Sequence, residues 1–303
     1  MRSKILCVGE YLADVLPSGL ELPGGAPANV AFHAAASTAV EAEVVSRIGD
    51  DARGRELRAR LRGAGIKDGL VQVDGARPTG TVQVRLDANG PGYEIGAPAA
   101  WDFLAESAEN TTAAQASSVV VFGTLAQRHP VARQTIRSLV GQARASGAMA
   151  VADLNLRAPF FDDEVIFWTL RHCDLLKLSR EELLIVSGRL GADGEMSSLF
   201  ERLVREFGLR RAVLTCGADG AWFFDQGRLW QQAAVPAEVV DSVGAGDAFA
   251  AVLAAAVAND VPLERVAPFA AEVAAYVVSQ PGAMPAWPRA LVERVGRVLH
   301  ANG

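Results

Sequence analysis

Residues 241–256 read DSVGAGDAFAAVLAAA, a run of small and acidic residues that changes abruptly into an almost wholly apolar segment. The turn made by Gly244, Ala245 and Gly246 would let the backbone come close to a ligand. A buried helix is predicted to begin near Asp247. The first amides of a helix lack internal partners and carry the positive end of its dipole. The stretch therefore predicts a phosphate-binding site at a helix N-terminus.

Asp247 admits two interpretations. An acidic residue near a helix N-terminus commonly caps it. Beside a bound phosphoryl group, however, a carboxylate can orient a hydroxyl and accept its proton, since phosphoryl transfer depends mostly on positioning and charge stabilisation. Capping does not explain the Gly-Ala-Gly that precedes Asp247, but these residues alone leave both roles open. The segment before them, residues 235–240 (VPAEVV), is predicted to be a strand.

The fold class follows from the alternation of β-rich runs and helical patterns along the 303 residues. Continuous apolar runs at residues 3–9, 117–123 and 148–154 predict strands buried on both faces, with amphipathic helices between them. This alternation is typical of an α/β fold in which helices cover both faces of a central, mostly parallel sheet. Because no linker or low-complexity tract appears, residues 1–303 are expected to form a single domain.

One segment breaks the alternation. Residues 79–95 alternate apolar and polar side chains around an Asn89-Gly90 turn signal, which predicts a hairpin with one solvated face. Such a hairpin does not belong in a sheet covered on both faces. We therefore predict a small β lid within residues 75–98, with residues 12–22 as its pairing partner.

Composition excludes several functional classes. The net charge is −6 and the basic residues are scattered, which disfavours a nucleic-acid partner. The three cysteines are odd in number and widely spaced, so neither a disulfide framework nor a CxxC metal site is expected, and a cytoplasmic location is predicted. The longest apolar run, residues 248–258, has 11 residues, too few to span a membrane that needs ~20.

A second group of small and polar residues lies near the N-terminus. Gly24 and Gly25 precede Pro27, and Asn29 opens a predicted helix. A turn followed by proline in the first helical turn explains the pattern structurally. Alternatively, the glycine pair admits a small polar ligand, and Asn29 offers its hydroxyl groups both a donor and an acceptor.

Polar residues also gather at the predicted strand end VADLNLR. Asp153, Asn155 and Arg157 alternate, so they are expected to point the same way. In open α/β sheets, ligands bind at the carboxyl ends of strands. A role in binding is therefore predicted for these three residues.

Two later strand ends complete the candidates. Lys177 ends a strand, and Ser179 with Glu182 matches the S-x-x-E capping box, although Lys177 and Glu182 would also suit a nucleotide phosphate or its Mg²⁺. The next strand is followed by a turn that can supply a second backbone clamp, formed by Thr215, Gly217 and Gly220. The four histidines lack metal-ligand spacing and are expected to be structural or surface residues: His33, His129, His172 and His300.

Neither a GxxxxGK[ST] loop nor a first-strand GxGxxG is present, which argues against a P-loop kinase and a nicotinamide oxidoreductase. Instead, the stretches together resemble the ribokinase-like, or PfkB, family of sugar kinases, in order and over nearly the whole chain. Residues 241–247 are similar to the family signature D-T-x-G-A-G-D, and residues 24–29 to G-G-x-x-x-N. Residues 47–54 resemble its G-x-D-x-x-G turn, and residues 153–157 its D-x-N-x-R.

The resemblance implies a ribokinase-like fold with a β lid over the sugar, and transfer of the γ-phosphoryl group of ATP, with Mg²⁺, to a primary hydroxyl. It also implies roles for single residues, with the loop at residues 279–284 facing a potassium-like ion. These are Asp247 as catalytic base; Gly244, Ala245 and Gly246 as anion hole; Asp14, Gly25, Asn29, Asn155 and Arg157 for the sugar; Lys177, Thr215, Gly217 and Gly220 for the nucleotide; Glu182 for Mg²⁺; and Asp241 for the monovalent cation.

Within the family, the stretches GGAPANVA and QPGAM are most similar to bacterial fructokinases, so fructose is the predicted substrate. Ribose, 2-keto-3-deoxygluconate and nucleosides stay open as alternatives, as does a catalytically silent sugar-binding protein. Relatives often dimerise through their lids, which makes a homodimer an expectation of the resemblance. Two departures stand out: Ser242 replaces threonine and keeps its hydroxyl, whereas Ser179 replaces the asparagine of the family's N-x-x-E.

Overall fold

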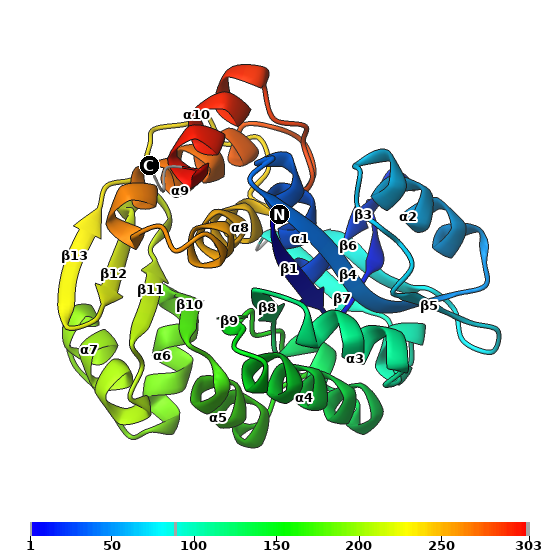
Figure 1. The fold of residues 1–303 in the computed structure, drawn as a ribbon, viewed down its shortest axis with the longest axis horizontal. Coiled ribbons are helices and arrows are strands. Elements are labelled where there is room, and N and C mark those ends of the chain that lie inside the picture. The colour runs from blue at the N-terminus through cyan, green and yellow to red at the C-terminus, as the bar shows by residue number, and fades with distance from the viewer. Residues whose placement is uncertain (1, 88–89, 301–303) are drawn as a thin grey trace.

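The computed structural model describes residues 2–87 and 90–300, with the backbone alone for residues 84–87, 90, 91 and 93. Its main sheet contains β1 (Ser3–Val8), β4 (Val40–Gly49), β5 (Val71–Asp74), β8 (Val119–Phe122), β9 (Met149–Asp153), β10 (Leu175–Ser179), β11 (Arg211–Thr215), β12 (Ala221–Asp225) and β13 (Arg228–Gln232). Their spatial order is β13-β12-β11-β10-β9-β8-β1-β4-β5 (Figure 1). From β5 to β11 all neighbours are parallel, and β12 and β13 add an antiparallel edge. The predicted α/β class is confirmed.

Helices cover both faces of this sheet, as the continuous apolar strands require. One face carries α1 (Ala26–Ala36), α2 (Ala52–Gly63), α8 (Ala245–Ala258), α9 (Leu263–Val278) and α10 (Arg289–His300). The other carries α3 (Ala108–Gln115), α4 (Pro130–Ala145), α5 (Asp163–His172), α6 (Arg180–Arg189) and α7 (Met196–Phe207). Short 3-10 turns are η1 (Ala100–Phe103), η2 (Leu125–Gln127) and η3 (Gly217–Asp219). No helix within the described ranges is both long and apolar enough to cross a membrane.

Helix α8 is the most deeply placed helix of the site. Every residue from 248 to 256 is buried, and the helix packs between α1 and α9. Its alanine-rich sequence suits this position, because small side chains let the neighbouring helices approach closely on all sides. The abrupt apolar run of the sequence therefore forms a rigid support for the polar turn at its N-terminus.

A second, smaller sheet has the order β3-β2-β6-β7, with β2 at Leu12–Val15, β3 at Glu21–Gly24, β6 at Gly80–Asp87 and β7 at Gly90–Ile95. Strand β2 pairs with β6 in parallel, and the other pairings are antiparallel. The predicted hairpin and its partner near residues 12–22 are both present. The predicted Asn89-Gly90 turn lies partly outside the described residues, which omit 88 and 89.

The prediction of a strand at residues 235–240 is wrong. This segment follows β13, the edge strand of the main sheet, and it joins neither sheet. Its valines are largely solvated, with Val239 71% and Val240 59% exposed. Only at its end does the backbone find partners, where the amides of Val240 and Asp241 donate to the carbonyl of Val278.

The small sheet is joined to the main body by Asp51, the N-cap residue of α2. Its Oδ1 accepts the Gly54 amide at 2.8 Å and the Thr79 hydroxyl at 2.7 Å, and its Oδ2 accepts the Thr79 amide at 2.8 Å. Thr79 immediately precedes β6 and packs closely against Gly49. A Cβ at residue 49 would lie only 2.5 Å from the Thr79 nitrogen, so there is no room for a side chain there. One carboxylate thus fixes both a helix terminus and the base of the small sheet.

We expect Asp51→Ala to lower the free energy of unfolding by about 2 kcal/mol, because it removes a helix cap and leaves the Thr79 amide without its partner. Urea unfolding followed by circular dichroism measures the change. Asp50→Ala is the matched control. Among the described residues, the Asp50 side chain pairs with Arg55 alone, in an exposed ion pair, so its replacement should change stability by less than ~0.5 kcal/mol. Equal effects of the two variants would contradict this account.

Candidate active site

The predicted anion hole lies at the N-terminus of α8. Gly244 is the N-cap residue with φ +81°, and no described side chain caps the helix. The backbone therefore turns sharply into the helix and leaves the amides of the first turn, from Ala245 to Asp247, facing away from the helix body. Residues 244–246 are called the anion-hole turn below. The geometry is that of a helix terminus prepared for an anion.

Asp247 lies at this turn and contacts the other predicted ligand-binding helix. Its Oδ2 accepts a hydrogen bond of 2.7 Å from Nδ2 of Asn29 on α1. Removal from bulk water and the charge of Asp153 raise the pKa of Asp247, Lys177 and Asn29 oppose the shift, and the result is a pKa of about 6. Asp247 caps no helix through its side chain, so the capping interpretation loses its support.

Lys177 lies directly behind the anion-hole turn. Its Nζ donates to Oδ1 and Oδ2 of Asp153 at 3.0 and 2.8 Å, and both side chains are buried. A Cβ on residue 246 would lie 2.8 Å from this Nζ, so the glycine is what allows the cation to approach the turn. Burial opposes the charge on Lys177, but the carboxylates of Asp153, Glu182 and Asp247 raise its pKa overall. The lysine is therefore a fixed cation beside the hole.

The glycine pair of the sequence accommodates protein groups as well as a ligand. A Cβ at Gly24 would lie 2.2 Å from Oδ2 of Asp14 on β2, and a Cβ at Gly25, where φ is +105°, would lie 2.4 Å from the carbonyl oxygen of Glu10. Burial raises the pKa of Asp14 to about 6, and the charge of Asp247 adds to the shift. Asp14, Gly25 and Asn29 are thus brought together beside Asp247, as predicted.

Glu10 is a site residue that the sequence reasoning missed. It follows β1, is 2% exposed, and its Oε1 accepts the Ala26 amide at the start of α1 at 3.2 Å. Burial raises its pKa to about 7, with Asp247 raising it and Arg157 lowering it. The only signal in the sequence is an acidic residue that interrupts an apolar strand, which periodicity alone assigns to a strand end.

The prediction that Asn155 and Arg157 continue the alternation of β9 is wrong. The strand ends at Asp153, and Asn155 takes a left-handed conformation with φ +44°, which breaks the two-residue repeat. Asn155 instead lines a small cavity with Glu10 and Asp153. Arg157 is exposed, but its charge lowers the pKa of Glu10, Asp14 and Asp247, so it still faces the same site.

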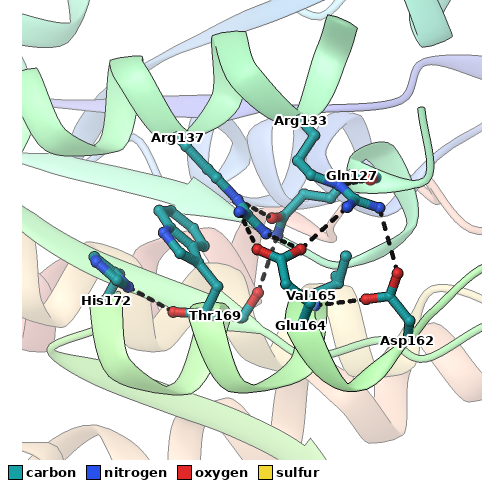
Figure 2. A network of polar contacts seen from close by, with 9 residues as sticks. Gln127, Arg133, Arg137, Asp162, Glu164, Val165, Thr169 and His172 are labelled. Carbon is teal, nitrogen blue, oxygen red and sulfur yellow. Dashed lines mark hydrogen bonds and ion pairs between the residues drawn. The ribbon is translucent and has the colours of Figure 1, made fainter. Parts of the chain in front are cut away.

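A polar network on the other face of the sheet fixes the loop that carries Asn155 and Arg157 (Figure 2). Glu164 at the start of α5 pairs with Arg133 and Arg137 of α4, and Arg133 also lies 3.6 Å from Asp162. Gln127 accepts from both arginines, through its backbone carbonyl and its side-chain Oε1. The network joins α4 to the first turn of α5 and so holds the far end of this loop.

The predicted capping box is present at the end of β10. Ser179 Oγ accepts the Glu182 amide at 3.3 Å, and Glu182 Oε2 accepts the Ser179 amide at 2.7 Å. Glu182 Oε1 also accepts the Leu156 amide at 2.7 Å, so both of its oxygens have backbone partners. Among the described residues no cluster of three acidic, cysteine or histidine side chains could hold a metal ion. The helix-capping interpretation is thus confirmed for Ser179, and the role of Glu182 toward Mg²⁺ stays a prediction.

The turn after β11 lies beside this box, since Thr215 pairs with Ser179 in the parallel ladder. Thr215 donates its hydroxyl to the Leu178 carbonyl at 3.3 Å. Gly217 and Gly220 both have positive φ, and a Cβ at Gly220 would lie 2.1 Å from the Gln232 carbonyl oxygen. The glycines are therefore required by the turn itself, whatever they contact in a complex.

Asp241 organises the loops around the anion-hole turn. Its Oδ1 accepts the Val243 amide and its Oδ2 the Gly282 amide, both at 3.0 Å. These bonds bring the predicted QPGAM loop against residues 241–244. Asp241 therefore orders this loop, and its role toward a cation stays a prediction.

Known proteins match this chain over nearly its whole length. The pattern described as "pfkB family carbohydrate kinase" matches residues 13–290. The chain belongs to this family. A fructokinase from Klebsiella pneumoniae is 30% identical over 95% of this chain and 97% of its own length, and one from Escherichia coli is 26% identical with the same coverage. The solved fructokinase with bound ATP from Xylella fastidiosa aligns with a TM-score of 0.86 at 24% identity, covering 98% of this chain and 99% of that one.

This membership confirms the predicted ribokinase-like fold and the enzyme class, a phosphotransferase with an alcohol group as acceptor. The pfkB kinase brings most of its predicted site residues to one edge of the sheet. Sequence reasoning missed Glu10 and could not foresee that Lys177 pairs with Asp153, since the two lie on neighbouring strands far apart in the chain.

Proposed function

We propose that this pfkB kinase transfers the γ-phosphoryl group of ATP to a primary hydroxyl of fructose. The observation that carries the proposal is the joint position of the uncapped amides at residues 245–247, the Asp247 carboxylate and the buried Lys177 cation. Amides and a fixed cation stabilise the charge of a transferring phosphoryl group, and the carboxylate beside them receives the proton of the attacking hydroxyl.

In the proposed reaction, Asp247 accepts the proton of the sugar hydroxyl as its oxygen forms a bond to the γ-phosphorus. The bond from that phosphorus to the bridging oxygen breaks, and ADP leaves. Asn29 holds the Asp247 carboxylate through its 2.7 Å hydrogen bond. Its own Oδ1 is buried and has no hydrogen-bond partner among the described residues, so it can accept from the substrate. The site thus orients base and sugar through one side chain.

A neutral sugar suits the charges of the site better than an acidic one. The charge of Asp247 raises the pKa of both Glu10 and Asp14, and Arg157 is a cation that lowers the pKa of all three carboxyl groups. A substrate carboxylate would add a further negative charge to this group. The balance favours fructose or ribose over 2-keto-3-deoxygluconate, and the fructokinase relatives favour fructose.

We propose ATP and Mg²⁺ as the nucleotide and ion, with Thr215, Gly217 and Gly220 along the nucleotide and Glu182 nearest the metal. Each Glu182 oxygen keeps a second lone pair beyond its backbone partner. Mg²⁺ bound with nucleotides typically takes one or two carboxylates, water and phosphate oxygens, so the absence of a larger acidic cluster among the described residues fits. The bound ion would offset phosphate charge.

A potassium-like ion near Asp241 and a homodimer through the small sheet complete the proposal. A solved double mutant of the fructokinase from Vibrio cholerae, 24% identical to this chain with a TM-score of 0.82, is described as bound to fructose, ADP and potassium. In this chain Asp241 and the loop it orders would supply carboxylate and carbonyl oxygens.

Replacing Asp247 by Asn should lower kcat by at least about 100-fold, because the amide cannot accept the hydroxyl proton. The sugar and ATP affinities should change little, since Asn keeps an oxygen for the Asn29 amide. Asp260→Asn is the matched control, an exposed position beyond the other end of α8 whose φ of +53° asparagine tolerates. Turnover of Asp247→Asn within about tenfold of wild type, ~1.4 kcal/mol of barrier, would reject Asp247 as the base.

The pH profile of kcat/KM should fall on the acidic side, with an apparent pKa of about 6 for the carboxylate cluster around Asp247. The sign follows from the role: a base must be ionised, so each pH unit below this value removes about nine-tenths of the active form. Glu10, whose pKa is about 7, is the competing source. Glu10→Gln should keep the acidic limb, and loss of the limb in that variant would assign it to Glu10.

A substrate screen separates the remaining alternatives. Purified protein assayed with ATP and Mg²⁺ should show a higher kcat/KM for fructose than for ribose, 2-keto-3-deoxygluconate or adenosine. Thermal shifts with each sugar report binding independently of turnover. A sugar that raises Tm without any ATP consumption would favour the silent binding protein over the kinase.

A further inference from the structure

The anion-hole turn rests directly on the loop at residues 280–284. A Cβ added at Gly244 would lie 2.6 Å from both the Cα and the carbonyl oxygen of Ala283, so the two backbones touch without space for a side chain. Next to this contact, the Gly282 amide donates to Asp241 at 3.0 Å. Any shift of Ala283 must therefore move the turn that forms the hole.

His33 forms a hydrogen bond with the same carbonyl. It lies on α1, is 0% exposed, and its Nε2 is 2.9 Å from the carbonyl oxygen of Ala283. The indole nitrogen of Trp287 lies 3.0 Å from His33 Nδ1. Because an indole N–H can only donate, Nδ1 must be the acceptor, and the ring proton sits on Nε2, from where it donates to Ala283.

His33 keeps one protonation state, the neutral one, over the working pH range. Burial lowers the pKa of His33 to about 4, with the Ala283 carbonyl opposing the shift, so the ring is neutral above pH 5. The ring lies between Phe32 of α1 and Trp287, with ring centroids at 5.3 and 5.9 Å. A neutral, enclosed ring with both nitrogens paired is a rigid spacer.

We propose that His33 is a positioning residue of the anion hole. It fixes the position of the Ala283 carbonyl against Gly244, and thereby the direction in which the first amides of α8 point. This inference rests on the proposed phosphoryl transfer. Asn29 lies one helical turn earlier on α1 and holds Asp247. One face of α1 would then align both the base and the hole, so that sugar site and phosphate site keep a fixed relation.

The competing explanation is that His33 is a satisfied core residue with no effect on the site. Both explanations predict lower stability on its removal, so a Tm alone does not distinguish them. They differ in what they predict for His33 variants. Only a positioning role predicts a lower kcat at unchanged sugar KM and a higher mobility of residues 241–247.

The experiment compares His33→Leu, His33→Gln and Trp287→Phe with His172→Leu as matched control. His172 is a second structural histidine, which stacks on Trp168 with centroids 4.2 Å apart and hydrogen-bonds its carbonyl on α5, away from the hole (Figure 2). His33→Leu should lower kcat at least about tenfold with sugar KM within about threefold, because a displaced hole misaligns the transition state. His33→Gln keeps an N–H for Ala283 and should recover most of that loss.

Hydrogen–deuterium exchange of the peptide covering residues 241–249, without ligand, gives a readout that needs no activity. It should speed up in His33→Leu and, more weakly, in Trp287→Phe, and stay unchanged in His172→Leu. Trp287→Phe serves if His33→Leu fails to fold. Unchanged exchange at 241–249 together with unchanged kcat in a folded variant would overturn the proposal. A wild type without kinase activity would reject the proposed function alone, because exchange still decides the role of His33.

Discussion

The first turn of α8 must leave its amides free for an anion and yet keep them still, and most of the surrounding structure serves that requirement. A polar side chain that capped the helix would hold the turn but would also occupy the amides. The chain supports the turn from behind instead. Residues 248–256 are wholly buried, Lys177 lies against Gly246, and Ala283 lies against Gly244. Glycine at 244 and 246 is required because each support comes within van der Waals contact of the backbone.

Charge at the site is concentrated by the same packing. Asp153 and Lys177 form a buried pair, which costs desolvation energy that apolar residues would avoid, so its presence in the sheet core indicates a task other than stability. Burial, reinforced by the charges of neighbouring carboxylates, raises the pKa of Asp14 and Asp247 to about 6, which brings the base closer to the pH at which it works. Packing and chemistry are therefore coupled at this edge of the sheet.

The two sheets have different relations to this centre. The main sheet places Glu10, Asp153 and Lys177 at or near the carboxyl ends of β1, β9 and β10, which parallel topology brings to the same edge of the sheet. The small sheet brings Asp14 over the glycine pair, and its attachment depends on Asp51, which links β6 to α2. The sugar-binding side of the site is thus carried by the small sheet and the phosphate side by the main body, and α1 contacts both.

Much of the protein was determined locally by its sequence. Continuous apolar runs specified the strands, because a strand buried on both faces has no polar side. The Gly-Ala-Gly before an apolar helix specified the anion hole, because backbone close approach requires small residues. A local pattern was misleading where the segment lacked a strand to pair with. Residues 235–240 look like a strand but join neither sheet, and Asn155 leaves the strand repeat through a left-handed conformation.

The long-range pairings could be decided only by the tertiary structure. Asn29 and Asp247 are 218 residues apart, and His33 and Ala283 are 250 apart, so no local spacing records that they meet. The raised pKa of Glu10 likewise depends on burial by segments distant in the chain. Sequence by itself determined which residues can do chemistry, since side-chain type and backbone freedom are local. Their mutual distances and ionisation were decided by folding, because both depend on which segments exclude water from one another.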